Sequence, residues 1–330
     1  MMRRLSQETS RKTALIFGVS GQDGAYLARL LLAKNYDVHG ASRDAARQPF
    51  ARLHALGIRE GVVAHTASMS DALALRRLID DVRPDEIYNL AGLSSVAESF
   101  AAAQDATASI AGAQQLLLDA VRDSGAPVRV YHSASSDCFG DLARGSAADE
   151  QTPFAPRSPY ARAKADAHRI TAEYRRRFGL FAVSALVCNH ESPLRGEAFV
   201  TKKIIAAAAA ASRGMLIGKL HLGDLGASRD WGYAPEYVDA MWRMLQQEQP
   251  ADYVLATGES HTVEELAAAA FAAFGFDYLD HITTDPALLR PSDIHYSRGN
   301  PTRARECLGW QAQTKFADLV KLLAKAASAD

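Results

Sequence analysis

The chain has 330 residues, and its 37 lysine and arginine side chains nearly balance its 38 aspartate and glutamate side chains. That length suits one large domain or two coupled domains with a core of ordinary size. The near-zero net charge argues against a nucleic-acid or membrane-surface partner, because both usually require an excess of basic residues. No apolar run approaches the ~20 residues that a membrane-spanning helix needs.

The three cysteines, Cys138, Cys188 and Cys307, are scattered and lack the spacing of metal ligands. We therefore expect no metal site and no disulfide framework, which fits a reducing, cytoplasmic setting. Residues 1–11 are polar and basic, and no apolar signal-peptide core follows them. We interpret this segment as a disordered tail.

Short apolar runs alternate with helical patterns through the first half of the chain. The expected strands are 14–17, 38–41, 62–65, 86–90, 128–131 and 182–187, and the expected helices are 25–34, 72–81, 106–124 and 160–177. Strict alternation of strands and helices predicts a parallel sheet with helices on both faces. The sequence therefore predicts an α/β protein built on a Rossmann-type doubly wound parallel sheet.

The alternation breaks after residue 188. Polar loops, an alanine-rich helix around 206–211 and a stretch rich in proline, aspartate and arginine at 285–301 indicate a smaller α/β substrate domain. The two domains look interleaved, because 253–256 again has the pattern of a buried strand. We expect 12–188 to form the dinucleotide-binding domain, with 229–258 returning to it, and 189–228 with 259–330 to form the substrate domain.

Three glycines with the spacing Gly18-x-x-Gly21-x-x-Gly24 follow the first expected strand and open the first helix. Glycine accepts a positive φ and lets the backbone approach a diphosphate, and the helix N-terminus supplies N–H groups and a favourable dipole. Such a sequence also fits a plain tight turn, but its place at the start of an alternating chain favours dinucleotide binding. The predicted contacts in this turn are Gly18, Ser20, Gly21, Gln22, Asp23 and Gly24.

Charged residues follow the second expected strand at Arg43, Asp44 and Arg47. In dinucleotide sites an acid at this place binds the ribose hydroxyls of NAD, whereas an arginine accommodates the 2′-phosphate of NADP. Arg43 and Arg47 favour NADP, although Asp44 is the residue type expected for NAD. A second interpretation is that these charges are only the solvated start of a helix.

Tyr160 and Lys164 lie four residues apart in an expected helix, so they share one face. A phenol with an ordinary pKa of ~10 is a poor base at neutral pH, and a fixed cation beside it favours the phenolate. Tyr-x-x-x-Lys is also common as a surface pair. Here the segment 156–159 fixes the entry to the helix, and we predict that the pair is catalytic.

The fifth expected strand leads into a polar segment that contains Ser135 and Asp137. Ligands bind at the carboxyl ends of the strands in such sheets, so Ser135 is a candidate hydrogen-bond partner of a substrate hydroxyl and Asp137 a candidate acid or base. The structural alternative is that these residues only cap and turn the chain. The neighbouring tyrosine and lysine favour the catalytic interpretation.

The chain resembles an extended short-chain dehydrogenase/reductase and, within that group, the GDP-mannose 4,6-dehydratase family. The block 189–196 (NHESPLRG) is more specific than the glycine-rich turn, which many sugar-nucleotide enzymes share. The segments that carry the resemblance are 18–28, 88–91, 152–164, 189–196, 199–203, 229–232, 236–247, 256–258 and 290–291.

The resemblance implies an enzyme with an internal hydride cycle on NADP and a GDP-sugar substrate. Tyr160 would take the C4 hydroxyl proton, Lys164 would tune Tyr160, Ser135 would contact the C4 oxygen and Asp137 would remove the C5 proton as water leaves C6. The family also implies a homodimer or homotetramer. Further implied contacts are Arg43, Ser68, Met69, Leu90, Ala91, Tyr160 and Lys164 with NADP, and Ser94, Asn189, Glu191, Val200, Lys203, Arg229 and Arg290 with the GDP-sugar.

The chain departs from the family pattern at several of these positions. Asp137 stands where the family has glutamate, Ser68 stands where an acid contacts adenine, and Gly92 with Leu93 replaces Ala-Gln beside the nicotinamide. These departures keep a GDP-manno-heptose 4,6-dehydratase, a 4-keto reductase and an epimerase open as alternatives. A non-catalytic protein that binds NADP or a GDP-sugar is a further alternative, although it would not need Tyr160 with Lys164.

Overall fold

The computed structural model describes residues 11–329, so nearly all of the predicted tail at 1–11 lies outside the described residues. Seven strands form one sheet in which every neighbouring pair is parallel. They are β1 (Thr13–Phe17), β2 (Asp37–Ser42), β3 (Val62–Thr66), β4 (Glu86–Asn89), β5 (Arg129–Ser133), β6 (Ala182–Val187) and β11 (Tyr253–Leu255).

The strand order is β11-β6-β5-β4-β1-β2-β3. The order reverses between β1 and β4, which makes this the switch point where doubly wound sheets open a crevice for ligands. The predicted doubly wound parallel sheet is therefore confirmed. Strands β4 and β6 are buried along their whole length, as expected for a sheet covered on both faces.

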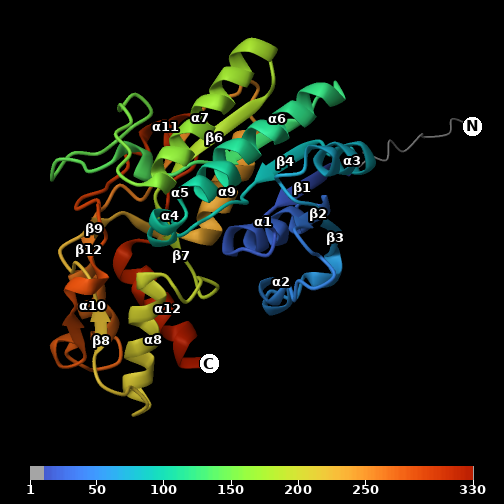
Figure 1. The fold of residues 1–330 in the computed structure, drawn as a ribbon. Helices are drawn as coiled ribbons and strands as arrows, with labels where there is room; N and C mark the ends of the chain where they lie inside the picture. The colour runs from blue at the N-terminus through green and yellow to red at the C-terminus, as the bar shows by residue number, and fades with distance from the viewer. Residues whose placement is uncertain (1–10, 330) are drawn as a thin grey trace, which may run out of the picture.

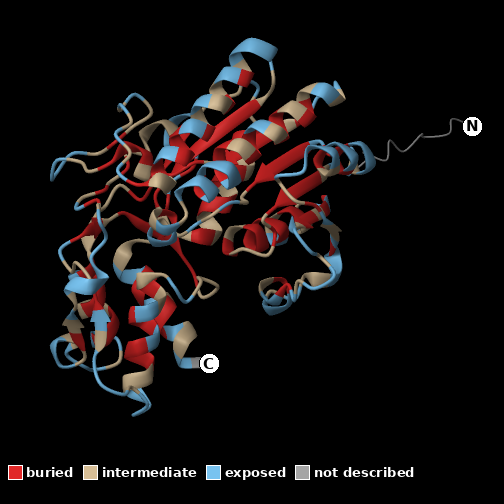
Figure 2. Ribbon diagram, viewed as in Figure 1, coloured by how far each residue is buried: buried red, intermediate tan, exposed pale blue. Residues whose placement is uncertain are grey.

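Helices cover the two faces of the sheet in separate layers (Figure 1). One layer holds α1 (Gln22–Ala33) and α9 (Ala234–Leu245), and the other holds α3 (Ala72–Val82), α6 (Ala113–Ser124) and α7 (Pro159–Phe178). Side chains alternate along a strand, so Ile16 of β1 packs in one core while Leu15 and Phe17 pack in the other. Figure 2 shows these strands as buried between helices whose outer faces are exposed.

A smaller region lies beside the carboxyl edge of the sheet (Figure 1). Its apolar core includes Ile204, Trp231, Leu266, Phe271 and Leu319. Its helices are α8 (Val200–Ser212), α10 (Val263–Ala272) and α12 (Phe316–Ala329), and its strand pairs are β7 (Asn189–Glu191) with β10 (Trp231–Tyr233), β8 (Leu220–Leu222) with β13 (Ile282–Thr284), and β9 (Ser228–Arg229) with β12 (His261–Thr262).

Shorter elements complete the described chain. They are the helices α2 (Ala51–Ala55), α4 (Val96–Ala101), α5 (Ala103–Thr107) and α11 (Thr302–Leu308), the 3₁₀ turns Arg59–Gly61, Ser136–Phe139, Tyr278–Asp280 and Pro286–Leu288, and a π-helical turn at Ala108–Gly112. Within residues 11–329, no helix combines the length and the apolar character that crossing a membrane requires.

Two features differ from the sequence expectation. The helix expected at 106–124 is interrupted by the π-helical turn at Ala108–Gly112. The spacing of apolar residues did not predict this turn, because it does not reveal one extra residue in a helical turn. Ala304, Leu308 and Trp310 pack in the core of the sheet with α9, although 259–330 was expected to belong to the substrate domain. The division into two domains with those boundaries stays a prediction.

Leu27 of α1 tests the packing between this helix and β1. Its side chain is fully buried, so Leu27→Ala removes apolar contacts and leaves a cavity. We expect a loss of about 2–5 kcal/mol in the free energy of unfolding, measured by denaturant titration. Leu73→Ala is the matched control, because Leu73 is 67% exposed and its loss should change stability by less than ~0.5 kcal/mol.

Candidate active site

Several chemistry-bearing segments meet at the carboxyl edge of the sheet. The strands β1, β4, β5 and β6 are neighbours and parallel, so their carboxyl ends lie together. The segments that follow them are the glycine-rich turn 18–24, the loop 90–95, the polar turn 133–139 and the block 189–196. The structure therefore brings together the segments that the sequence singled out.

The glycine-rich turn lies directly against the end of β4. Gly18 has a φ of +83°, and a Cβ placed on it would be 2.8 Å from the carbonyl oxygen of Leu90. A Cβ on Gly24 would collide with the backbone of Gly18 and Val19. The N-cap of α1 is Gly21, and no side chain caps the helix there. Open amides at a helix N-terminus fit the diphosphate of a dinucleotide.

The predicted contacts Gln22 and Asp23 lie at the start of α1, with their side chains bonded to the block 189–196. Gln22 donates to the carbonyl oxygen of His190, and His190 lies 2.8 Å from a carboxylate oxygen of Asp23. Their backbone amides remain at the turn that would receive a diphosphate. The imidazole of His190 is therefore held within the protein by Asp23 and by the carbonyl oxygen of Cys188.

Residues that would contact the adenosine half of a dinucleotide follow β2 and β3. Arg43 is exposed, and the exposed Arg47 lies 3.7 Å from the carboxylate of Asp44. Ser68 is half-buried and its hydroxyl lies 2.8 Å from that of Ser70. Both arginines are therefore open to a phosphate in the described structure.

The turn after β4 is held by a buried amide network. Asn89 accepts a hydrogen bond from the backbone of Ala91 at 3.1 Å and donates to Gln114 at 2.7 Å. Gln114 donates in turn to Thr171 of α7. This network fixes Leu90 and Ala91, two of the predicted NADP contacts, relative to the helix that carries Tyr160.

The four predicted catalytic residues converge from β5 and α7. Ser158 caps α7 by accepting from the Ala161 amide, and this cap places Tyr160 and Lys164 on the inner side of the helix. The ammonium of Lys164 lies 5.8 Å from the centre of the Tyr160 ring and donates to the Ser133 carbonyl oxygen at 2.6 Å. Ser135 accepts from the amide of Asp137, so it also caps the 3₁₀ turn.

Burial controls the protonation of these groups. Burial raises the pKa of Tyr160 above its ordinary value, and the negative charge of Asp137 adds to that rise, while hydrogen bonding from Ser135 opposes it. Burial lowers the pKa of Lys164 to about 8. Burial also raises the pKa of Asp137, although the positive charges of Arg229 and Arg290 oppose that rise. The pKa of Asp137 therefore lies closer to neutral pH than that of an ordinary aspartate, as suits a general acid or base.

The two predicted phosphate-binding arginines share one carboxylate. Arg229 donates to Asp293 at 3.0 Å and to the carbonyl oxygen of Ile294 at 2.6 Å, and Arg290 donates to the same Asp293 oxygen at 3.2 Å. Arginines held in this way are preorganised to bind a diphosphate. The diphosphate and Asp293 would compete for the same guanidinium groups. Their positive charge also acts on Asp137, a predicted catalytic residue, and opposes the rise of its pKa.

The remaining predicted substrate contacts differ in their surroundings. Glu191 is buried, accepts from Thr201 at 2.6 Å and pairs with Arg195 at 3.0 Å, so its carboxylate is already occupied within the protein. Lys203 on α8 and Ser94 after β4 are exposed. Asn189 and Val200 are half-buried.

Sequence reasoning missed several residues of the site. Asn89 and Ser192 lay inside segments that carried the resemblance, but nothing marked their side chains as structural. Asp293 lay in the charged stretch 285–301. Arg52 had no sequence signal, although it links the glycine-rich turn to Leu194.

Among residues 11–329, no group of three potential metal ligands is present.

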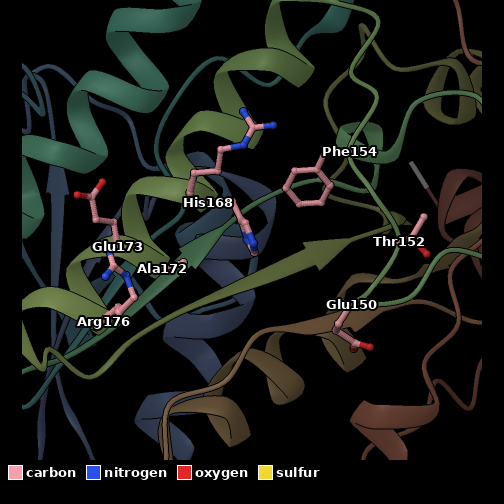
Figure 3. Close-up of a pocket in the computed structure, with 8 residues that line it drawn as sticks. Glu150, Thr152, Phe154, His168, Ala172, Glu173 and Arg176 are labelled. Atoms are coloured by element: carbon pink, nitrogen blue, oxygen red, sulfur yellow. The ribbon is translucent and has the colours of Figure 1, made fainter.

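A cavity of about 540 Å³ lies farther along α7, next to the loop that contains Glu150 and Phe154 (Figure 3). Its lining includes His168, one helical turn beyond Lys164, but none of the predicted catalytic residues. Glu150 accepts a hydrogen bond from the backbone amide of Val254, and Arg169 pairs with Asp166, so both side chains have partners within the chain. The cavity is therefore separate from the candidate active site.

The titration of Lys164 tests the burial of this predicted catalytic residue. Because burial destabilises the charged ammonium, its pKa falls from the ordinary 10.5 to about 8. We expect one lysine side-chain signal to titrate near pH 8 in NMR spectra of protein with ¹³C-labelled lysine, and Lys164→Met to remove that signal. A spectrum in which the Lys164 signal titrates like an exposed amine would contradict the buried position.

Known proteins resemble this chain over almost its whole length. A family model described as GDP-mannose 4,6 dehydratase matches residues 15–323. GDP-mannose 4,6 dehydratase 2 of Arabidopsis thaliana is 46% identical over 324 residues, which cover 95% of this chain and 86% of that protein. The GDP-mannose 4,6 dehydratase of Homo sapiens is 38% identical, with coverage of 94% of this chain and 90% of that protein.

Solved structures support the fold independently. UDP-glucose 4-epimerase of Thermus thermophilus, in complex with NAD, has a TM-score of 0.83 at 23% identity and covers 96% of this chain and 98% of its own. DesIV, a dTDP-glucose 4,6-dehydratase from Streptomyces venezuelae, also has a TM-score of 0.83, at 23% identity, and covers 95% of this chain and 96% of its own. The family model and the relatives confirm the resemblance seen in the sequence: the chain belongs to the GDP-mannose 4,6-dehydratase family.

Proposed function

We propose that this protein is an NADP-dependent GDP-mannose 4,6-dehydratase, which converts GDP-mannose into GDP-4-keto-6-deoxymannose and water. The observation that carries the proposal is the convergence of Ser135, Asp137, Tyr160 and Lys164 at the carboxyl edge of the parallel sheet. The names of relatives that are 37–46% identical support the same substrate and reaction.

Tyr160 and Lys164 act in the oxidation at C4. Tyr160, as phenolate, takes the proton of the C4 hydroxyl, and Ser135 hydrogen-bonds the C4 oxygen. Burial and the charge of Asp137 raise the pKa of Tyr160. The positive charge of the buried Lys164 ammonium, held by the Ser133 carbonyl 5.8 Å from the centre of the Tyr160 ring, would oppose that rise and favour the phenolate. When bound at the glycine-rich turn, the dinucleotide would accept the C4 hydride and later return it to C6.

Asp137 acts in the elimination. The C4 ketone makes the C5 proton acidic, and the Asp137 carboxylate takes this proton. The C6 hydroxyl leaves as water when it receives a proton, which the protonated Asp137 can donate. The raised pKa of Asp137 suits both steps. A group that first accepts a proton and then donates it works best when its pKa lies near the operating pH.

The arginines support the assignments of cofactor and substrate. Arg43 and Arg47 after β2 are exposed and would receive the 2′-phosphate that distinguishes NADP from NAD. Arg229 and Arg290 would bind the diphosphate of the GDP-sugar, because a guanidinium forms paired hydrogen bonds to phosphate oxygens.

Proton NMR of the product tests the reaction. We expect purified protein with GDP-mannose and catalytic NADP⁺ to produce a new C6 methyl doublet. Tyr160→Phe should lower the rate by about 10²–10⁴-fold, since it removes the C4 base while leaving GDP-mannose binding intact. If the wild-type protein binds GDP-mannose but does not convert it, the proposed dehydration of GDP-mannose is refuted. Another GDP-sugar, or a reductase or epimerase reaction, would then be favoured.

The pH dependence tests the role of Asp137. A base must be deprotonated to act, and burial raises the pKa of Asp137 above 3.8. As the pH is lowered, kcat/KM should therefore begin to fall at a higher pH than it would with an ordinary aspartate as the base. On the alkaline side it should fall as Lys164 loses its charge near pH 8. Asp137→Asn should reduce kcat at least ~10²-fold, and Asp137→Glu, which keeps the carboxylate, serves as the control. An unchanged kcat in Asp137→Asn would exclude this residue as the C5 base.

A further inference from the structure

Side-chain hydrogen bonds join the glycine-rich turn, residues 18–24, to the substrate segment, which we define as residues 189–196. Gln22 donates to the carbonyl oxygen of His190 at 3.1 Å and accepts from the hydroxyl of Ser192 at 2.7 Å. The Nε2 atom of His190 lies 2.8 Å from a carboxylate oxygen of Asp23. Two segments more than 160 residues apart in the chain are thus in direct polar contact.

The geometry of His190 defines its charge. Its Nε2 faces the carboxylate of Asp23, and its Nδ1 lies 2.8 Å from the carbonyl oxygen of Cys188. Both neighbours only accept hydrogen bonds, and a neutral imidazole donates from only one nitrogen. Only the imidazolium satisfies both contacts, so His190 and Asp23 form a charged pair.

The surroundings of the pair agree with this charge. Burial alone would lower the pKa of His190, but Asp23 raises it above the ordinary value. The pKa of Asp23 falls to about 2 in spite of burial, because His190 and Arg195 stabilise its charge. Arg195 opposes the protonation of His190, and the Tyr237 ring stacks on the imidazole with 4.9 Å between the ring centres.

Asp23 occupies a place where a negative charge is unfavourable for a ligand. It lies in the first turn of α1, and the open amides of this turn would receive the diphosphate of the dinucleotide. An unpaired carboxylate there would repel the diphosphate. The imidazolium of His190 neutralises it, so the substrate segment supplies the positive charge that the dinucleotide turn needs.

Arg52 provides a second bridge between the same segments. Its Nε donates to the carbonyl oxygen of Leu194 at 2.8 Å, and its Nη1 donates to the carbonyl oxygen of Ser20 at 3.1 Å. One guanidinium therefore holds the backbone of the glycine-rich turn and that of the substrate segment together. Displacing one segment would break these bonds with the other.

We infer that Asp23 and His190 are positioning residues that couple the two binding steps: a dinucleotide on the glycine-rich turn strengthens binding of the GDP moiety by the substrate segment, and the GDP moiety strengthens dinucleotide binding. The identity of the two ligands rests on the proposed function. Ordering one segment orders the other through the shared bonds, so the second ligand loses less conformational entropy on binding. Thermodynamic linkage makes the coupling equal in both directions.

Such coupling suits a reaction that uses one dinucleotide for both oxidation and reduction. A sugar bound before the dinucleotide could not react, and a dinucleotide released in mid-cycle would leave the ketone intermediate behind. Coupled binding favours the state in which both ligands are present. Asp23 and His190 act here by positioning the two segments, since the hydrogen bonds of both side chains are made within the protein.

Calorimetric titration with GDP, with and without saturating NADPH, measures the coupling. GDP lacks the sugar, so it does not touch the nicotinamide and any coupling passes through the protein. We expect the Kd of GDP to fall at least ~5-fold when NADPH is bound, the lower end of typical coupling. Asp23→Asn and His190→Gln should bring the ratio of the two Kd values toward one.

Asp239→Asn is the matched control, because Asp239 also forms a partly buried ion pair, with Arg243 on α9, but lies outside both segments. It should keep the wild-type ratio. A wild-type ratio of one would overturn the coupling without any variant. It would also be overturned if Asp23→Asn and His190→Gln weaken both titrations equally and leave the ratio unchanged, as a purely structural role predicts. Absence of GDP or NADPH binding would instead refute the proposed function, and the coupling with it.

Discussion

The close approach of the Gly18 backbone to the end of β4 is the constraint on which the rest of the site depends. A side chain at Gly18 would collide with the Leu90 carbonyl, and one at Gly24 would collide with Gly18 itself. This contact brings the open N-terminus of α1 to the switch point of the sheet. Every other functional segment is placed relative to this point by the parallel strands, whose carboxyl ends lie at one edge.

Charge at this edge is balanced by partners from distant parts of the chain. The buried Lys164 donates to Ser133, Asp23 pairs with His190, and Asp293 is shared by two arginines. Each arrangement satisfies a charge that would be costly to bury alone. Asp137 has no comparable hydrogen-bonded partner for its carboxylate among the described residues, and burial raises its pKa although the charges of Arg229 and Arg290 oppose the rise. The site thus keeps one carboxyl group available for proton transfer while its other buried charges are held.

The substrate segment serves two purposes in this arrangement. Its strand β7 pairs with β10 of the smaller region, while His190 and Ser192 bond to the first turn of α1. The same eight residues therefore connect the sheet to the region that would hold the GDP moiety.

The sequence by itself determined the parallel sheet, the approximate positions of its strands, the glycine-rich turn and the shared face of Tyr160 and Lys164, since periodicity and spacing are local properties of the chain. It did not reveal the π-helical turn or the packing of Trp310 under the sheet. Nor did it reveal that the side chains of Gln22 and Asp23 bond to 190–192, or that Asp293 joins Arg229 to Arg290. The contacts of Trp310, of Gln22 and Asp23 with 190–192, and of Arg229 with Asp293 were decided by tertiary structure, because the partners lie far apart in sequence and meet only when the strands and the smaller region have packed.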